Sequence, residues 1–265
     1  MPCLRAPRGY TLTYTLLPSY TLPLFRLGDE EAVKLYGWRA GARIRVEGGR
    51  VCCKGCSLEE LASWTGLWAT IETRYGVVGL SVSPWDDDLI LASVVASQNT
   101  SWWRSVGWLH RLLPLLERSL HAEALRAAED IGSYQARRAV EAHRAYLGVR
   151  LAVRTAGLWG ARRLLLEKVP YAGVKTVHAY LLFTTHSGYP VPVDRHTARA
   201  LGASWMPRRE VCARYPCPRC PYRRKCPVWR LFEAHGWRAG LHQTRLWLES
   251  QTPASLRRLL EAASP

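Results

Sequence analysis

Apolar positions recur at helical spacing through most of the chain after residue 80. Val177, Tyr180, Leu181 and Phe183 are three or four residues apart or adjacent, the pattern of a helix that buries much of its surface. Other periodic stretches predict helices at about 105–118, 122–129, 139–147, 228–235, 241–250 and 254–263. The sequence therefore predicts a mainly α-helical protein from about residue 81 onward.

The first 80 residues follow a different pattern, in which apolar and polar side chains alternate. This alternation at Tyr10–Leu16 and at Ala42–Val46 predicts strands, whose side chains point to opposite faces in turn. Gly48 and Gly49 then give a turn signal, and Arg50–Cys53 is expected to be the returning strand. We expect a small N-terminal antiparallel β subdomain over residues 1–80.

The chain is strongly basic, which favours a polyanionic partner. Its 37 lysines and arginines exceed its 21 acidic residues, giving a formal net charge of +16. No apolar run is long enough to span a bilayer, and Met1–Tyr10 lacks a signal-peptide core. We therefore expect a cytoplasmic protein of a prokaryote, associated with the nucleoid. We also expect the protein to be a monomer. The single asparagine, Asn99, and the scarcity of glutamine suit a thermophile, and an arginine-rich coding bias would give a similar composition.

Four cysteines near residue 220 have the spacing of a metal site. The run is C-x4-C-x2-C-x5-C and consists of Cys212, Cys217, Cys220 and Cys226. Thiolates grouped in this way suit zinc or an iron–sulfur cluster. We expect the loop at 206–230 to hold one metal centre.

A second group of cysteines lies near the N-terminus. Cys53 and Cys56 have metal-like spacing, with Cys52 beside them and Cys3 far upstream. No second metal-binding pair is obvious, so a disulfide or buried free thiols are equally compatible with this pattern.

A short glycine turn at Pro170–Gly173 joins two predicted helices. Backbone N–H groups at the start of the second helix, from Val174 to about Thr184, suit a DNA phosphate. Lys175 lies in the first turn of that helix, where the dipole disfavours an ammonium and makes the free amine easier to reach. Lysine is rare in this chain, and arginine cannot form a Schiff base. Asp194 is a natural N-terminal cap for a third helix.

These residues resemble the helix-hairpin-helix and Gly/Pro–Asp element of the base-excision DNA glycosylase superfamily, the endonuclease-III-type enzymes. The matching residues are Val169-Pro170, Gly173, Lys175-Thr176 and Val193-Asp194-Arg195-His196; the family usually has glycine where Tyr171 stands. The resemblance implies a two-lobed helical fold, with a glycosylase core at 81–205, a hairpin at 164–186, a catalytic loop at 187–196 and C-terminal helices at 231–265. The N-terminal β subdomain resembles the sheet of the 8-oxoguanine and alkyl-adenine branches.

The resemblance also implies a function, that of a bifunctional DNA glycosylase and AP lyase. Lys175 would be the nucleophile and Asp194 the essential carboxylate. The partner would be double-stranded DNA with a damaged base, and Gln98 matches a side chain that fills the space left by the flipped base. The implied DNA-binding residues are Gln98, Asn99, Tyr134, Tyr171, Gly173, Thr176, Arg195 and His196.

The cysteine run is similar to the family's iron–sulfur loop, C-x6-C-x2-C-x5-C, which implies a [4Fe–4S] cluster, with zinc as the alternative. This chain departs from the family in two ways. Its first gap is two residues shorter, and the run begins eighteen residues after Asp194, whereas two helices usually intervene in the family.

Two other functions remain open from the sequence. One is a monofunctional glycosylase for mismatched, uracil or alkylated bases, in which Asp194 acts with water and Lys175 only contacts phosphate. The other is a non-catalytic helix-hairpin-helix or zinc DNA-binding module. The lesion is also open, because the β subdomain favours an oxidised purine whereas the cysteine run favours a pyrimidine or a mismatch.

Overall fold

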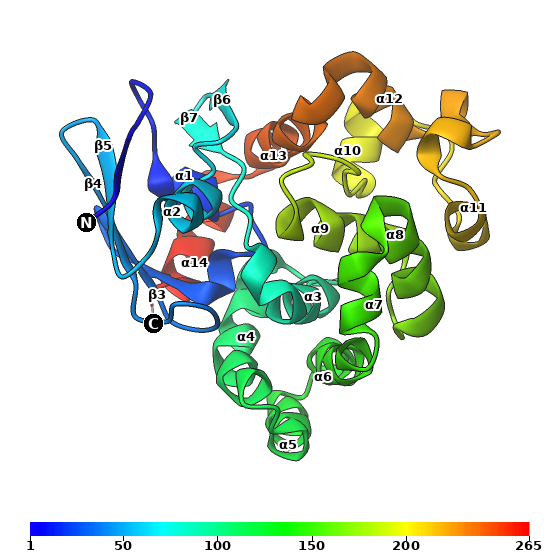
Figure 1. The fold of residues 1–265 in the computed structure, drawn as a ribbon, viewed down its shortest axis with the longest axis horizontal. Coiled ribbons are helices and arrows are strands. Elements are labelled where there is room, and N and C mark those ends of the chain that lie inside the picture. Colours follow the sequence, from blue (N-terminus) through cyan, green and yellow to red (C-terminus); the bar gives the residue numbers. More distant parts are fainter. Residues whose placement is uncertain (265) are drawn as a thin grey trace.

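The computed structural model describes residues 1–264, apart from the side chains of Arg195 and His196. It is mainly helical, with a small antiparallel sheet near the N-terminus (Figure 1). This confirms the predicted fold class. Within the described part of the chain, no helix is both long and apolar enough to cross a membrane.

The N-terminal sheet has five strands in the order β1-β5-β4-β3-β2, and all neighbours are antiparallel. The predicted hairpin around Gly48 and Gly49 is confirmed, with Val46 opposite Val51 in the register. A separate two-stranded hairpin, β6–β7, follows. The strands are β1 (Cys3–Arg5), β2 (Phe25–Leu27), β3 (Glu31–Lys34), β4 (Arg43–Glu47), β5 (Arg50–Lys54), β6 (Thr70–Thr73) and β7 (Gly76–Gly79).

The predicted strand at Tyr10–Leu16 is wrong, because this segment forms the short helix α1 (Leu12–Leu16). Leu12, Thr15 and Leu16 are three or four residues apart or adjacent, so they lie on one face of this helix, and all three are buried. The hydroxyl of Thr11 accepts a hydrogen bond from the Tyr14 N–H, so the helix has an N-terminal cap. The local cap and the burial of these side chains together override the alternating pattern.

Helix α3 (Asp87–Ala96) lies at the centre of the helical part and packs against α4, α6 and α9 (Figure 1). Nearly all of its residues are buried, which fits a helix covered on every side. Around it are α4 (Trp102–Glu117), α5 (His121–Ile131), α6 (Tyr134–Leu147), α7 (Arg150–Thr155), α8 (Gly157–Lys168) and α9 (Val174–Thr184). The predicted helix at 139–147 is the second half of α6.

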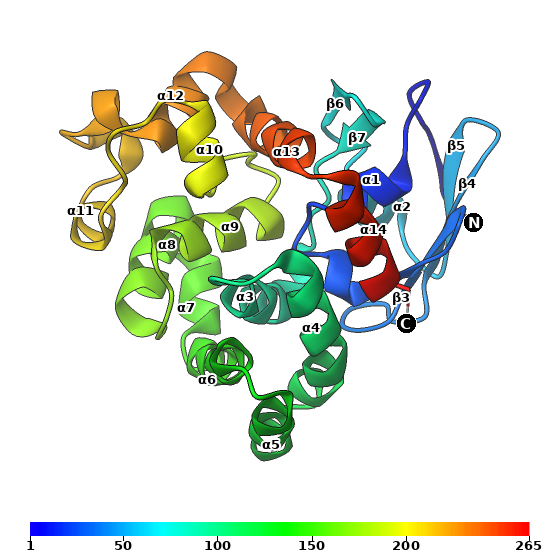
Figure 2. The ribbon, with the colours of Figure 1, turned by 180° about the vertical axis from the view of Figure 1, so that it is seen from behind.

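The C-terminal part of the chain returns to the N-terminal sheet. Helix α14 (Pro253–Ala262) packs on α4 (Figure 2). Just after this helix, the Ala263 carbonyl accepts a hydrogen bond from the Leu27 N–H at 2.9 Å. The sheet and the central helices share one continuous hydrophobic core. The helices in this part are α10 (Arg195–Ala200), α11 (Arg209–Arg214), α12 (Pro227–His235), α13 (Ala239–Ser250) and α14 (Pro253–Ala262); α2 (Leu58–Thr65) lies beside the sheet.

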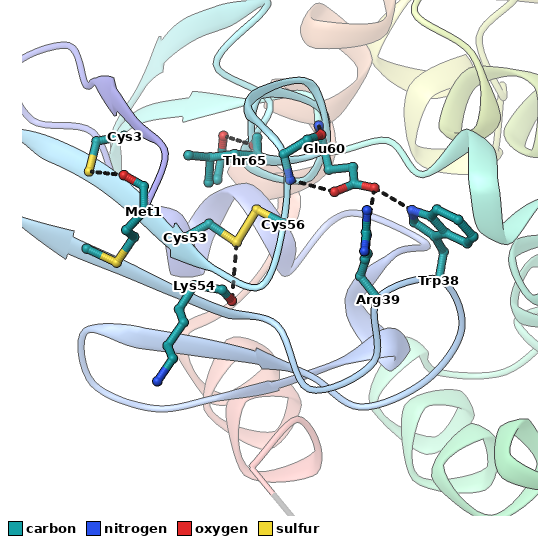
Figure 3. Close-up of a disulfide and its surroundings, with 11 residues drawn as sticks. Met1, Cys3, Trp38, Arg39, Cys53, Lys54, Cys56, Glu60 and Thr65 are labelled. Atoms are coloured by element: carbon teal, nitrogen blue, oxygen red, sulfur yellow. Dashed lines mark hydrogen bonds and ion pairs between the residues drawn. A yellow bond between two sulfur atoms is a disulfide. The ribbon is translucent and has the colours of Figure 1, made fainter.

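The N-terminal cysteines form two disulfides, which answers the question that their spacing left open. Cys3 pairs with Cys52 and so joins β1 to β5. Cys53 pairs with Cys56, just before α2 begins (Figure 3). These four residues are therefore part of the scaffold and are distinct from the cysteines near residue 220.

Candidate active site at the helical hairpin

Helices α8 and α9 form the predicted hairpin, and the second helix has the predicted bounds. The turn between them is closed by hydrogen bonds from Ala172 N–H to the Val169 carbonyl and from Gly173 N–H to the Tyr171 carbonyl. Tyr171, where the family has glycine, has a φ of +62°. This left-handed conformation is the one that glycine favours, so the turn keeps a glycine-type backbone although its side chain has changed.

Lys175 is the second residue of α9 and the only residue of that helix that is not buried. Gly173 is its N-cap and supplies no capping side chain, so the first N–H groups of the helix open toward the turn. The buried residues on either side fix the backbone of Lys175 in the core. The partly exposed Lys175 side chain therefore lies at the N-terminus of α9, the end of the helix that attracts an anion.

Asp194 is the N-cap of α10, as predicted, and its carboxylate accepts a hydrogen bond from the Thr197 N–H at 2.8 Å. The loop before it is attached to α9, because His178 Nδ1 donates to the Val191 carbonyl at 3.3 Å. Burial, with the nearby charge of Arg162, lowers the pKa of His178 to about 3, so the imidazole is neutral. His178 thus connects the helix of Lys175 to the loop of Asp194.

A close backbone contact also holds this loop against α13. The Gly240 N–H donates to the Gly188 carbonyl at 2.9 Å. A Cβ at Gly188 would lie only 1.8 Å from the Trp237 carbonyl oxygen, and Gly188 has a φ of +62°. Both constraints require glycine at position 188, so the backbone at the start of the Asp194 loop is held in one conformation.

Gln98 lies beyond the end of α3 and reaches the hairpin. Its side-chain amide donates to the Tyr171 carbonyl and to Thr176 Oγ1, each at 2.8 Å. Thr176 is buried, so its hydroxyl helps to hold Gln98 in place. Asn99 is exposed with a φ of +53°, which suits asparagine better than most residues. The fold therefore brings the predicted Gln98 turn and the hairpin together.

Tyr134 and Tyr171 are both at the surface and both approach Arg138, whose guanidinium lies over their rings. No role was assigned to Arg138 from the sequence. The side chains of Arg195 and His196, which were predicted to bind DNA, lie outside the described residues. The DNA contacts of all the predicted residues stay predictions.

The four cysteines of the second group line one small cavity, together with Arg162 and His178. Arg162 Nη1 donates to Cys217 Sγ at 3.0 Å. Arg162 Nε, His178 Nε2 and Tyr189 Oη are among the buried polar atoms that have no hydrogen-bond partner in the part of the chain that is described. No group of three or more His, Cys, Asp or Glu among the described residues is arranged to hold a metal ion. The metal centre therefore stays a prediction.

The cavity borders a second hydrophobic core, which also contains part of the Asp194 loop. Val191 and Val193, just before Asp194, share this core with Cys217 and Cys226. In its chemistry, though not in its present arrangement, the donor set suits a thiolate-bound centre, because four soft sulfurs line one cavity and the Arg162 cation would offset their negative charge. Any group bound here would therefore also hold the Asp194 loop.

Basic side chains cover the outer surface of the cysteine loop. They are exposed to solvent and available to an anionic partner: Arg208, Arg209, Arg214, Arg219, Arg223, Arg224 and Lys225. This group agrees with the strong positive charge of the chain.

No family model matches this chain, and no curated protein is similar to it in sequence. Solved structures are similar over nearly its whole length. MBOgg1 in complex with a low-affinity DNA ligand has a TM-score of 0.63 and 13% identity, covering 92% of this chain and 93% of that one. The Clostridium acetobutylicum 8-oxoguanine glycosylase/lyase with DNA containing cytosine opposite 8-oxoguanine has a TM-score of 0.66 and 12% identity, covering 91% and 92%.

The same Clostridium acetobutylicum enzyme in its apo form has a TM-score of 0.62 and 12% identity, covering 92% of this chain and 94% of that one. At this level of identity the similarity establishes the fold. The chain therefore shares its fold, mainly helical with a small N-terminal sheet, with these solved structures.

Proposed function

We propose that this protein is a DNA glycosylase with AP lyase activity that removes an oxidised base from double-stranded DNA. The observation that carries the proposal is the position of Lys175, the one partly open side chain on the otherwise buried helix α9. The attachment of the Asp194 loop to that helix through His178 supports it. The fold shared with an 8-oxoguanine glycosylase/lyase supports it further.

The proposed reaction begins when a damaged nucleotide is flipped out of the duplex. The neutral amine of Lys175 attacks C1′ of the sugar and loses a proton, while the bond from C1′ to the base breaks and the base leaves with the electron pair. The carboxylate of Asp194 stabilises the positive charge that develops on the sugar. The C1′–O4′ bond of the sugar then opens to give a Schiff base between Lys175 and C1′. Loss of a proton from C2′ permits β-elimination, in which the 3′ C–O bond breaks, the phosphate leaves with the electron pair and the strand is nicked.

The substrate we propose is an oxidised purine such as 8-oxoguanine. Support comes from the N-terminal sheet, which was the feature favouring a purine, and from the named activity of the solved Clostridium enzyme. In the proposed complex a phosphate binds at the N-terminus of α9, and Gln98 with Asn99 enters the space left by the flipped base. We also propose that the protein acts as a monomer in the cytoplasm, at the nucleoid.

The alternatives make different predictions for a panel of duplexes containing 8-oxoguanine, thymine glycol, uracil, a mismatch or an abasic site. We expect release of 8-oxoguanine together with cleavage of that strand, and cleavage at the abasic site. Base release without cleavage would instead identify a monofunctional enzyme. Binding without release or cleavage of any duplex would leave only a DNA-binding module.

We further propose that Cys212, Cys217, Cys220 and Cys226 hold a [4Fe–4S] cluster, with zinc as the alternative. The bound group would supply a rigid cross-link for the loop that follows α10. Arg162 would donate to the sulfur of Cys217, to which its Nη1 lies at 3.0 Å. The proposed chemistry of base release uses none of these residues.

Replacing Cys217 with serine is expected to remove most of the bound metal and to lower the melting temperature, because one of four ligands is lost. The measurement is iron, sulfide and zinc content together with visible absorption. The matched control is Cys3→Ser with Cys52→Ser, which removes one disulfide and should leave the metal content unchanged. Wild-type protein without iron but with one zinc would favour the zinc alternative, and protein purified anaerobically with neither metal would contradict the site.

A further inference from the structure

Arg138 is held at the protein surface by two tyrosines from different parts of the chain. Its guanidinium carbon lies 4.7 Å from the ring centroid of Tyr134 and 4.9 Å from that of Tyr171. Tyr134 is the first residue of α6, one turn before Arg138, whereas Tyr171 belongs to the hairpin turn. Tyr134 and Tyr171 are 52% and 39% exposed, so this tyrosine–arginine cluster faces solvent.

The charge of Arg138 is not paired with a carboxylate. The nearest acid on the same helix, Glu141, accepts from Arg137 Nε at 2.9 Å with one oxygen and from the Tyr171 hydroxyl at 2.6 Å with the other. The hydrogen bond from Tyr171 helps to hold the pKa of Glu141 below its ordinary value. Among the residues that the structure describes, no acidic side chain lies within ion-pair distance of Arg138.

This arrangement positions the cation, and no described residue accepts a hydrogen bond from its side-chain N–H donors. A guanidinium has five such donors, and a contact with a ring face leaves them free for an acceptor. Five N–H groups in a planar fork match the oxygens of a phosphate. The cluster therefore has the form of a pre-positioned anion-binding side chain.

The hairpin turn next to Arg138 indicates which anion the Arg138 side chain would bind. Tyr171 stands two residues before Gly173, the N-cap of α9, and its carbonyl accepts from Gln98 at 2.8 Å. Tyr171 also keeps a bulky side chain at a φ of +62°, where glycine would be unstrained. That side chain links the hairpin to Glu141 and to Arg138, contacts that glycine could not make.

We propose that Arg138 binds a phosphate of the DNA strand, next to the phosphate at the N-terminus of α9, and that Tyr134 and Tyr171 hold it in position. This inference rests on the proposed function, since it names further contacts to the same DNA. It assigns a specific role to the aromatic residue that replaces the family's glycine in the hairpin.

The test is the affinity of the full-length protein for a duplex containing a tetrahydrofuran abasic analogue, measured over a range of salt concentrations. Arg138→Ala is expected to weaken binding about tenfold and to reduce the slope of log affinity against log salt by about one. Arg137→Ala is the matched control, because it removes the same charge from the neighbouring residue. The guanidinium of Arg137 is already paired with Glu141. The Arg137→Ala substitution should weaken binding by no more than about threefold.

Tyr171→Gly distinguishes the contribution of the tyrosine side chain from that of the backbone conformation of the turn. Glycine keeps the left-handed conformation, so the melting temperature should be unchanged or higher, while binding weakens as in Arg138→Ala. Equal losses in Arg137→Ala and Arg138→Ala, or wild-type binding by Arg138→Ala, would overturn the inference and leave the proposed function intact. Wild-type protein that fails to bind the duplex would overturn both.

Discussion

Replacing Lys175 with glutamine is expected to reduce strand cleavage at a damaged base by at least about 10⁴-fold, while binding to the damaged duplex is retained. Glutamine has a similar length but no amine, so it cannot form the covalent bond with C1′ that the proposed reaction requires. The substitution should fold normally, because Lys175 is the one residue of α9 that is not buried. Single-turnover cleavage of an 8-oxoguanine duplex and of an abasic duplex measures the effect.

Lys168→Gln provides the matched control for this experiment. Lys168 is exposed at the end of α8, on the same hairpin, so its replacement removes the same charge close to the same DNA. We expect a small loss of affinity and a normal rate of cleavage from the bound complex. Cleavage by Lys175→Gln at a rate close to that of Lys168→Gln would show that Lys175 is only a phosphate contact.

Replacing Asp194 with asparagine is expected to slow release of the damaged base by about 10²–10³-fold. Asparagine is as good an N-cap as aspartate, so the bond to the Thr197 N–H and the start of α10 should be preserved. The substitution therefore removes the negative charge with little change in structure. Base release in a single turnover and the melting temperature are the two measurements.

A second substitution at the same position separates capping from charge. Asp194→Ala loses the cap as well and should cost about 1 kcal/mol of stability in addition to the slower reaction. Cleavage at a preformed abasic site should suffer less in both variants, because no base has to be expelled. Base release by Asp194→Asn at the wild-type rate would rule out the proposed role of the carboxylate.

The parts of the site that the sequence predicted correctly are governed by short-range signals. Pro170, Gly173 and the apolar spacing after it determine the hairpin and both ends of α9, and Asp194 caps the next helix through a bond to a residue three positions away. The strand predicted at Tyr10–Leu16 failed for the same kind of reason. Its alternating pattern also fits a helical face, and a cap at Thr11 decides between them.

The contacts that sequence reasoning missed join residues far apart along the chain. Arg138 gains its position from Tyr171, and Arg162 reaches Cys217, neither of which spacing can indicate. His178 could be seen only as a buried position on α9, although it attaches the Asp194 loop to the helix of Lys175. The pairing of Cys3 with Cys52 likewise depends on the strand order of the sheet.

The most direct test of the central claim is reductive trapping of the wild-type protein on DNA, followed by mass mapping of the adduct. The protein is incubated with an 8-oxoguanine duplex and with an abasic duplex, and borohydride is added. We expect a covalent adduct on both duplexes, located on the peptide that contains Lys175 and absent from Lys175→Gln. An adduct on another residue, or no adduct on the abasic duplex, would contradict the proposed role of Lys175.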